Sequence, residues 1–233
     1  MVPLDRYSVF PRAIDALYKE TRLPFKLIVV EGNASENMRY EIEKRKQKYK
    51  NIQIVYTDHH PRLAEAFNLG LVHIRTKHAF LMHNGLVVTP GWLENLMEQA
   101  KAREGVLCPY VSNAQDPPSF VHALLVTKEL LNDIGLFDES IGTALMGMDL
   151  INRLKAKGIP VHRDPYTVLE CPVDAAPKNG DRQFFAHQWD DPHARQTLAY
   201  LKQKWGVAPD EIKYLEWLEK RGLIPAPFPK AHS

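Results

Sequence analysis

Short runs of apolar, often β-branched residues alternate along this chain with stretches whose apolar residues recur every three or four positions. Residues 26–30 and 52–56 have the length and composition of buried strands. Residues 36–50 and 63–74, which follow them, place their apolar side chains on one helical face. Strands that alternate with helices pack as a sheet covered by helices. The sequence therefore predicts an α/β fold with a mainly parallel sheet.

The same pattern continues through most of the chain. It predicts further strands at residues 79–82, 86–88, 106–111, 120–126, 159–162 and 166–170. It predicts further helices at residues 10–20, 92–102, 128–134, 149–157, 194–205 and 212–218. A chain of 233 residues suits one large domain and is too short for two independent enzymes. We expect one domain over residues 1–191, with a C-terminal helical extension and Pro-rich tail over residues 192–233.

Charge and cysteine content exclude few partners but favour one compartment. Thirty Lys and Arg residues face twenty-eight Asp and Glu residues, and a net charge of +2 gives no support for a nucleic-acid partner. Cys108 and Cys171 form no CxxC pair, so neither a disulfide scaffold nor a zinc knuckle is indicated. The first ten residues do not resemble a secretory signal, and no transmembrane segment is expected. These features favour a cytoplasmic protein.

Common catalytic motifs do not occur in the sequence. It contains no GxGxxG, P-loop, HExxH or GxSxG motif, which removes direct support for dehydrogenases, P-loop NTPases, zincins and serine hydrolases. Asp58, His59 and His60 form the densest group of metal-ligand types. Adjacent side chains on an extended segment point in opposite directions, and no third ligand has suitable spacing. We therefore predict no dedicated metal site there.

Polar residues follow three of the expected strands at the points where those strands end. Glu31, Asp58 and His83 each come just past a strand. Open parallel sheets bind ligands beyond the carboxyl ends of their strands. We therefore expect these three side chains to converge on one crevice, whatever the ligand.

Five segments, in order and with suitable spacing, resemble family 2 glycosyltransferases of the GT-A fold. They are Val29-Val30-Glu31-Gly32-Asn33-Ala34-Ser35, Leu63-Ala64-Glu65-Ala66-Phe67-Asn68-Leu69-Gly70, the stretch from Phe80 to Leu93, Gly135-Leu136-Phe137-Asp138-Glu139 and the stretch from Asp149 to Gly158. The resemblance covers residues 1–170. It implies a GT-A-like enzyme that moves a sugar from a nucleotide-sugar donor, of UDP or GDP type, to a hydroxyl acceptor with inversion.

The resemblance also implies a set of donor-binding residues. In the family, the position of Glu31 contacts the base or ribose of the nucleotide, and Asn33 lies nearby. Asn68 matches an asparagine on the helix that lines the donor pocket; alternatively, it caps a neighbouring backbone group. The candidate donor-binding residues are Glu31, Asn33, Asp58, Arg62, Asn68, His83 and Asn84.

The sequence departs from the family pattern where the family binds its metal. Family members carry Asp-x-Asp at this strand end, where this chain has His83-Asn84-Gly85. Hard divalent cations prefer oxygen ligands, so binding of Mg²⁺ or Mn²⁺ is disfavoured. Without a metal, fixed cations must neutralise the donor diphosphate. Arg62, together with Lys178 and Arg182 in a long polar loop, is a candidate; alternatively these are solvated charges.

A second departure lies on the acceptor side. The family's Glu-Asp-x-Asp-Leu reads Met146-Gly147-Met148-Asp149-Leu150 here, so the usual base position is Gly147. Asp149 is the remaining candidate catalytic base; alternatively, it only starts a helix.

A third departure is at the chain start. Residues 2–6 retain only the end of the family's first strand, so either the start is late or the sheet has lost a strand. An uncovered neighbouring strand would be a candidate surface for forming a homo-oligomer.

Two other functions remain open. The chain could be a non-catalytic GT-A-like protein that binds a nucleotide or sugar, or serves as a scaffold. It could instead glycosylate a modified base in nucleic acid, with the basic helix of residues 39–50 contacting phosphates.

Overall fold

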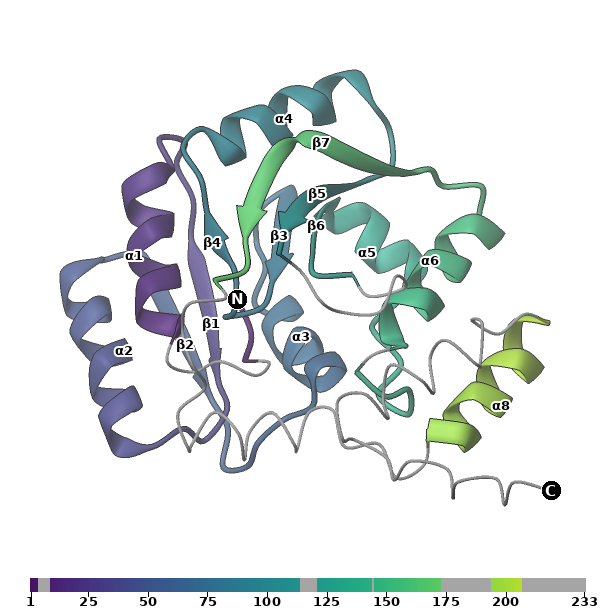
Figure 1. Ribbon diagram of the computed structural model, residues 1–233, viewed down its shortest axis with the longest axis horizontal. Helices are drawn as coiled ribbons and strands as arrows, with labels where there is room; N and C mark the ends of the chain where they lie inside the picture. Colours follow the sequence, from purple (N-terminus) through teal and green to yellow (C-terminus); the bar gives the residue numbers. More distant parts are fainter. Residues whose placement is uncertain (4–8, 114–120, 144, 173–193, 207–233) are drawn as a thin grey trace, which may run out of the picture.

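The computed structural model describes residues 1–3, 9–113, 121–143, 145–172 and 194–206, and Figure 1 shows their arrangement. The strands are β1 (Leu27–Glu31), β2 (Ile52–Tyr56), β3 (His78–Met82), β4 (Val87–Val88), β5 (Val106–Ser112), β6 (Ala123–Thr127) and β7 (Val161–Glu170). The helices are α1 (Phe10–Glu20), α2 (Glu36–Lys48), α3 (Leu63–Leu71), α4 (Trp92–Ala102), α5 (Lys128–Ile134), α6 (Met146–Ala156) and α8 (Ala194–Trp205).

Two elements differ from the sequence-based expectation. Helix α6 begins at Met146 rather than Asp149, because Met146 is buried on the same helical stripe as Leu150 and Leu154. The two short strands expected at 159–162 and 166–170 form one strand, β7. Its register against β5 shifts next to Asp164, whose carboxylate accepts hydrogen bonds from the strand residues that follow it. The helix expected at 212–218 lies outside the described residues.

The strands form one sheet of two strands and one of five. Strands β1 and β2 pair in parallel, and the larger sheet has the order β3-β6-β5-β7-β4. Among the described strands of the larger sheet, β5 and β7 pair in parallel, β6 runs antiparallel to β3 and β5, and β4 runs antiparallel to β7. The α/β fold with flanking helices is confirmed, but its sheet is mixed rather than mainly parallel. An apolar run shows that a strand is buried without showing its direction.

Helices cover the sheets on two faces. One apolar cluster lies among α3, α5, α6 and α8, and a second lies among α1, α2 and α4. Strand residues alternate between them: Val30 packs in the first cluster and Val29 in the second. Both faces of the central strands are therefore buried, which explains their continuous apolar runs.

The chain start connects the two sheets. The Met1 nitrogen donates to Ile28 O at 2.8 Å, and Val30 N donates to Met1 O at 3.1 Å. Val2 N donates to Met82 O at 3.0 Å, and Asn84 N donates to Val2 O at 2.8 Å. Residues 1 and 2 thus lie between β1 and β3 as a short parallel strand, and Figure 1 shows the amino terminus inside the fold.

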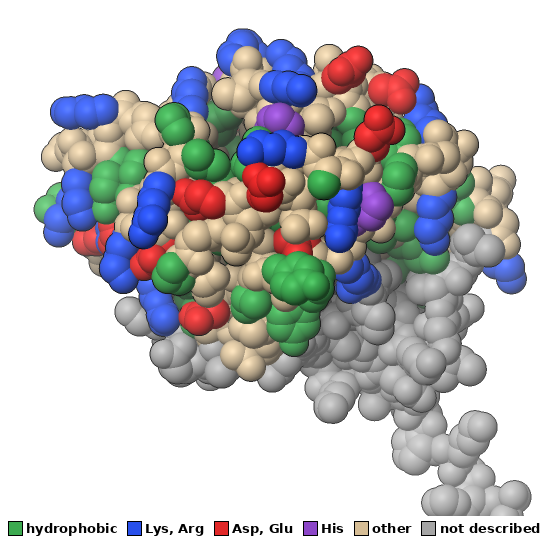
Figure 2. All heavy atoms as spheres, turned by 90° about the horizontal axis from the view of Figure 1, so that it is seen from above, with side chains coloured by type: hydrophobic (Ala, Val, Ile, Leu, Met, Phe, Trp, Pro, Cys, Tyr) green, Lys and Arg blue, Asp and Glu red, His purple; other side chains and the backbone are tan. Residues whose placement is uncertain are grey.

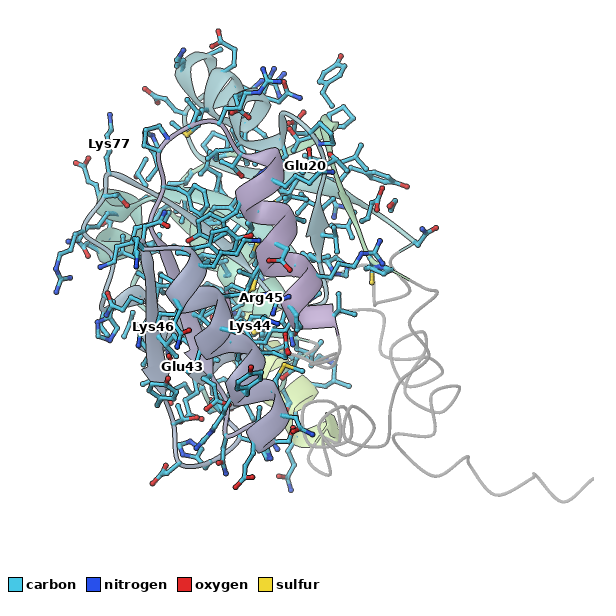
Figure 3. The ribbon with its side chains drawn as sticks, turned by 90° about the vertical axis from the view of Figure 1, so that its left-hand side faces the viewer. Glu20, Glu43, Lys44, Arg45, Lys46 and Lys77 are labelled. Carbon is cyan, nitrogen blue, oxygen red and sulfur yellow. The ribbon has the colours of Figure 1, made fainter. Side chains whose placement is uncertain are left out.

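Charges of opposite sign are interspersed on the surface. The face in Figure 2 carries Lys and Arg side chains among Asp and Glu side chains. On α2, Arg45 lies towards α1 (Figure 3) and donates to Asp15 Oδ2 at 2.6 Å and to Glu41 Oε2 at 2.7 Å. Lys46 lies 3.7 Å from Glu43. The basic residues of α2 are therefore partly neutralised by acidic neighbours. In the described part of the chain, no helix is long and apolar enough to span a bilayer.

Candidate functional site

The carboxyl ends of β1 and β2 lie side by side, because Glu31 and Tyr56 are paired in the parallel register. Just past them, Asn33 Nδ2 donates to Asp58 O at 3.2 Å. Asn33 has a left-handed backbone conformation with φ of 56°, which asparagine tolerates better than most residues. A shallow groove of about 730 Å³ opens here. We call it the strand-end groove, and the residues that line it are Asn33, Arg39, Tyr56, Thr57, Asp58, His59, Glu65 and Leu69.

Glu31 lies beneath this groove rather than in it. Its side chain is fully buried, and Oε1 accepts a hydrogen bond from Ala34 N at 2.5 Å. Its other oxygen, Oε2, forms an ion pair with Arg39 Nε at 3.2 Å. Arg39 in turn donates from Nη2 to Asn33 Oδ1 at 3.0 Å. Glu31 therefore holds both the turn after β1 and the arginine that lines the groove. Sequence reasoning assigned Arg39 only to a basic helix surface and missed this contact.

His59 links two carboxylates at the groove. Its Nδ1 lies 2.8 Å from Asp58 Oδ1, and its Nε2 lies 2.7 Å from Glu65 Oε1. The hydrogen bonds to Asp58 and then to Glu65 raise the pKa of His59, and the hydrogen bond from His59 lowers the pKa of Asp58. The Asp58 side chain is 97% exposed, so its carboxylate is accessible to a ligand.

Two candidates on or beside α3 have different surroundings. Arg62 is half-buried and precedes the first helical residue, Leu63. Asn68 is buried, and its amide donates to Phe137 O at 3.0 Å and to Glu139 Oε1 at 2.7 Å. Its Oδ1 accepts from Phe137 N at 2.8 Å. Asn68 thus fastens a distant backbone segment to α3.

His83 and Asn84 are buried beyond the end of β3 and do not line the strand-end groove. Residues 1 and 2 separate this strand from β1, so the expected convergence of Glu31, Asp58 and His83 is only partial. Asp58 lies with Asn33 above the buried Glu31, and His83 lies apart. His83 Nδ1 accepts from Gly85 N at 3.1 Å, and its Nε2 lies 3.3 Å from His122 Nδ1. In the neutral ring, the hydrogen therefore lies on Nε2 and is donated to His122.

The residues at 83–85 do not fit a hard divalent cation. Mg²⁺ and Mn²⁺ take mainly carboxylate, carbonyl and water oxygens, and this segment contains no carboxylate. Each ring nitrogen of His83 already has a hydrogen-bond partner. Among the described residues, no three His, Cys, Asp or Glu side chains are grouped to hold a metal ion.

Asp149 lies in a buried ion-pair network that joins α6 to α8. Its side chain is 1% exposed, and Oδ2 accepts from Arg153 Nε at 2.9 Å. Its Oδ1 accepts from Trp205 Nε1 at 2.9 Å and lies 2.9 Å from Lys204 Nζ. Its two oxygens are thus occupied by three donors. In this arrangement Asp149 cannot reach the hydroxyl of an acceptor.

Lys204 also pairs with Asp138, which follows α5. Asp138 Oδ2 lies 2.8 Å from Lys204 Nζ and accepts from Tyr200 OH at 3.0 Å. Burial alone would raise the pKa of Asp138, but hydrogen bonds from Lys204, Ser140 and Tyr200 outweigh it and lower that pKa below its ordinary value. We call Asp138, Asp149, Arg153, Lys204 and Trp205 the α8 cluster. Sequence reasoning missed Lys204, although it predicted the helix at residues 194–205 that carries it. The loop candidates Lys178 and Arg182 lie outside the described residues.

A comparison with protein families shows which family the chain belongs to. The sequence model described as glycosyl transferase family 2 matches residues 4–153. The chain belongs to this family. The comparison with curated proteins gave no match. The resemblance that the sequence motifs indicated is therefore confirmed at the level of the family.

Solved structures agree with the fold of this family 2 chain. It is similar to a mannosyltransferase from Pyrobaculum calidifontis in complex with GDP-Man and Mn²⁺, with a TM-score of 0.65 and 16% identity over 95% of this chain and 68% of that one. It is also similar to S. aureus TarS 1-349 in complex with UDP, with a TM-score of 0.61 and 13% identity over 97% and 80%. GalNAc-T7 with UDP, GalNAc and Mn²⁺ gives a TM-score of 0.62 and 10% identity over 95% and 54%.

Proposed function

We propose that this chain transfers a sugar from a nucleotide-sugar donor to a hydroxyl acceptor, with inversion and without a divalent metal. The observation that carries the proposal is the strand-end groove of a family 2 fold, where the exposed Asp58 lies beside Asn33 and Arg39. All three similar structures described above hold GDP-Man or UDP, which supports a nucleotide-sugar donor. Ligand binding beyond the carboxyl ends of parallel strands supports this location.

Asp58 and Asn33 are the groups we expect to contact the nucleoside. The Asp58 carboxylate offers acceptors for ribose hydroxyls or base N–H groups, and Asn33 offers an amide at the same edge. Glu31 is fully buried, so we assign it a positioning role through Ala34 N and Arg39. Arg62 is the described cation that precedes α3, and we propose that it helps to neutralise the diphosphate together with Lys178 and Arg182.

In the transfer itself, the acceptor oxygen attacks the anomeric carbon while the bond from that carbon to the diphosphate oxygen breaks. The nucleoside diphosphate leaves with the bonding electrons, and the hydroxyl proton passes to a base. As that base, Asp149 would first have to lose Lys204 and Trp205. The proposal therefore includes displacement of the final turn of α8 before the acceptor is deprotonated.

A donor-binding panel tests the proposal. UDP-, GDP-, dTDP- and CMP-sugars are added to the full chain, with Mn²⁺ or with EDTA, and thermal unfolding is followed. A donor at about 100 times its Kd stabilises the folded state by roughly 2.7 kcal/mol. We expect one nucleotide class to raise the Tm equally in Mn²⁺ and in EDTA. A shift that EDTA abolishes would contradict metal independence, and no shift with any donor would contradict donor binding.

The second candidate is a non-catalytic nucleotide- or sugar-binding protein. One observation favours it: the base position is Gly147, and the remaining carboxylate, Asp149, is buried under three donors. Donor binding without any hydrolysis or transfer of the sugar, in a screen of hydroxyl acceptors, would favour this candidate. Formation of a glycosylated acceptor would exclude it.

A further inference from the structure

Asp58 and Asn33 present different hydrogen-bonding groups to a ligand in the strand-end groove. The Asp58 side chain is 97% exposed, and an ionised carboxylate offers two oxygens that only accept hydrogen bonds. The hydrogen bond from His59, at 2.8 Å, lowers the pKa of this carboxyl group and so favours its ionised form. The exposed Asn33 amide nitrogen carries two hydrogens, and one is donated to Asp58 O at 3.2 Å. The groove therefore offers one amide donor beside two carboxylate acceptors.

The surrounding contacts hold this row of groups in place. Arg39 Nη2 donates to Asn33 Oδ1 at 3.0 Å, which directs the amide nitrogen of Asn33 rather than its oxygen towards Asp58. On the other strand end, Thr57 Oγ1 donates to Glu31 O at 2.8 Å and to His59 O at 2.7 Å. The backbone on both sides of Asp58 is thus tied to β1. A ligand therefore meets hydrogen-bonding groups that are ordered before it binds.

The four common classes of nucleobase differ in how their edges match one donor beside two acceptors. Guanine presents the O6 acceptor followed by the N1–H and N2–H donors, which is the complementary order. Uracil and thymine present a single N–H between two carbonyl oxygens, so one carboxylate oxygen would face a carbonyl oxygen. Cytosine and adenine present a ring nitrogen that accepts where the carboxylate needs a donor. A buried or partly buried acceptor without a donor is costly, so guanine is the base that fits.

Tyr56 adds an aromatic surface to the same groove. Its side chain lines the groove and is 50% exposed, and its hydroxyl donates to Glu43 on α2, which restrains the ring. Stacking of a base on an aromatic side chain contributes about 1–3 kcal/mol whatever the base. A purine has two fused rings and covers more of such a surface than a pyrimidine does. The stacking surface therefore agrees with a purine.

Building on the function proposed above, we propose that the donor is a GDP-sugar and that Asp58 determines this specificity. The Asp58 carboxylate accepts hydrogen bonds from guanine N1–H and N2–H, and Asn33 Nδ2 donates to O6. The other carboxylate of the groove, Glu65, is only 30% exposed and lies 2.7 Å from His59 Nε2. Asp58 is the more accessible of the two, so the base is assigned to it.

Titration calorimetry of the full chain with four nucleotides tests the proposal. The four are GDP, UDP, inosine diphosphate, which lacks the 2-amino group of guanine, and xanthosine diphosphate, which has an oxygen in its place. We expect GDP to bind about tenfold more tightly than inosine diphosphate, because one hydrogen bond to a charged group is lost, and UDP to bind more weakly still. In Asp58→Asn, an amide N–H can donate to the added oxygen of xanthine. The affinity for GDP should therefore fall about tenfold, and that for xanthosine diphosphate should rise.

Glu65→Gln is the matched control, because it neutralises the second carboxylate of the same groove. It should leave the order of the four affinities as in the unaltered chain. Loss of that order in Glu65→Gln, with no change of order in Asp58→Asn, would overturn the assignment to Asp58.

Failure of this inference and failure of the proposed function give different results. Tighter binding of UDP than of GDP, or equal binding of GDP and inosine diphosphate, would overturn the choice of guanine and leave donor binding intact. Absence of binding for all four nucleotides would contradict the proposed function and this inference together. Because Asp58 is exposed, the Asp58→Asn chain should unfold at the same temperature as the unaltered chain without nucleotide, so an altered order of affinities reports on recognition of the base.

Discussion

The strand-end groove and the α8 cluster lie on different elements of this family 2 chain and differ in accessibility. At the groove, the Asp58 side chain is 97% exposed, whereas in the cluster the Asp149 side chain is 1% exposed. The groove is an open surface, and its histidine joins two carboxylates at its edge. In the cluster, the carboxylates of Asp138 and Asp149 are matched by the cations of Arg153 and Lys204.

The difference in accessibility separates donor binding, at the strand-end groove, from deprotonation of the acceptor, at the α8 cluster. The groove is open and the Asp58 side chain in it is exposed, so we expect donor binding to require little rearrangement. Deprotonation of an acceptor by Asp149 requires its contacts with Lys204 and Trp205 to break. Breaking a buried, hydrogen-bonded charge network costs several kcal/mol, which a bound donor or acceptor would have to supply. The comparison therefore predicts that stability and donor binding respond to different residues.

The largest effect is expected for Asp149→Ala. The substitution leaves the largely buried Arg153 without its carboxylate partner and Lys204 with Asp138 alone, which costs about 3–5 kcal/mol in the free energy of unfolding. Urea unfolding measures this change. Asp133→Ala is the matched control, because Asp133 is 58% exposed and its ion pair with Lys157 contributes about 0–1 kcal/mol. Equal losses in the two variants would mean that α8 does not cover Asp149 in solution.

Acidification should act on the chain start before it acts on the α8 cluster. Burial lowers the pKa of the Met1 amino group from its ordinary value of 8.0 to about 5 in the folded chain. Between pH 8 and pH 5 the unfolded chain binds this proton and the folded chain does not, so stability falls as the pH falls. Three pKa units correspond to about 4 kcal/mol.

The pKa of Asp138 is lowered in the folded chain. Its contribution to the stability of the folded state is therefore present above the pKa that Asp has in the unfolded chain, about 3.9, and is lost only as the pH falls further. Urea unfolding at pH 8 and pH 5.5 compares the free chain with an N-terminally acetylated one. The free energy of unfolding of the acetylated chain should fall much less between pH 8 and pH 5.5. Parallel losses in the two forms would show that the amino group is exposed rather than buried beside β1.

A smaller effect is expected for Glu31→Ala, which removes support from beneath the groove. The Ala34 N–H and the Arg39 guanidinium lose their carboxylate partner, which costs about 1–3 kcal/mol of stability. Because Arg39 then no longer holds Asn33 in place, donor affinity should fall about tenfold. Glu31→Gln keeps the shape of the side chain and should lose less stability and less donor affinity than Glu31→Ala. Titration calorimetry with the donor from the panel separates affinity from stability, and an unchanged Kd in Glu31→Ala would remove Glu31 from the positioning role.

Local signals predicted many elements well. Helix α5 has the predicted bounds because Thr127 caps its start, accepting from Leu130 N at 3.2 Å, and Gly135 ends it with φ of 81°. These determinants lie within the element. The direction of β6 depends on which neighbours it pairs with, and no apolar run encodes that choice.

The candidate site, too, depends on contacts between distant elements that local sequence signals do not encode. The motif order indicated the family, and the strand ends predicted that Glu31, Asp58 and His83 would converge, of which Glu31 and Asp58 lie at the same edge, where Asn33 meets Asp58. The covering of Asp149 depends on Trp205, 56 residues further along, and the contact of Asn68 with Phe137 spans 69 residues. Such contacts are set by how helices pack after the sheet forms, so the two roles considered for Asn68 could not be separated from the sequence.

The smallest effect on stability and the most selective effect on binding are expected for Asp58→Asn. Asp58 is exposed and its bond to His59 lies at the surface, so the Tm without donor should stay within experimental error. If the carboxylate accepts a hydrogen bond from the nucleoside, loss of its charge should weaken donor binding about tenfold. Asp133→Asn makes the same charge change away from the groove and should leave the Kd unaltered. Equal weakening of donor binding in the two variants would attribute the effect to net charge alone. Weakening only in Asp58→Asn would place the donor at the strand-end groove rather than at the α8 cluster.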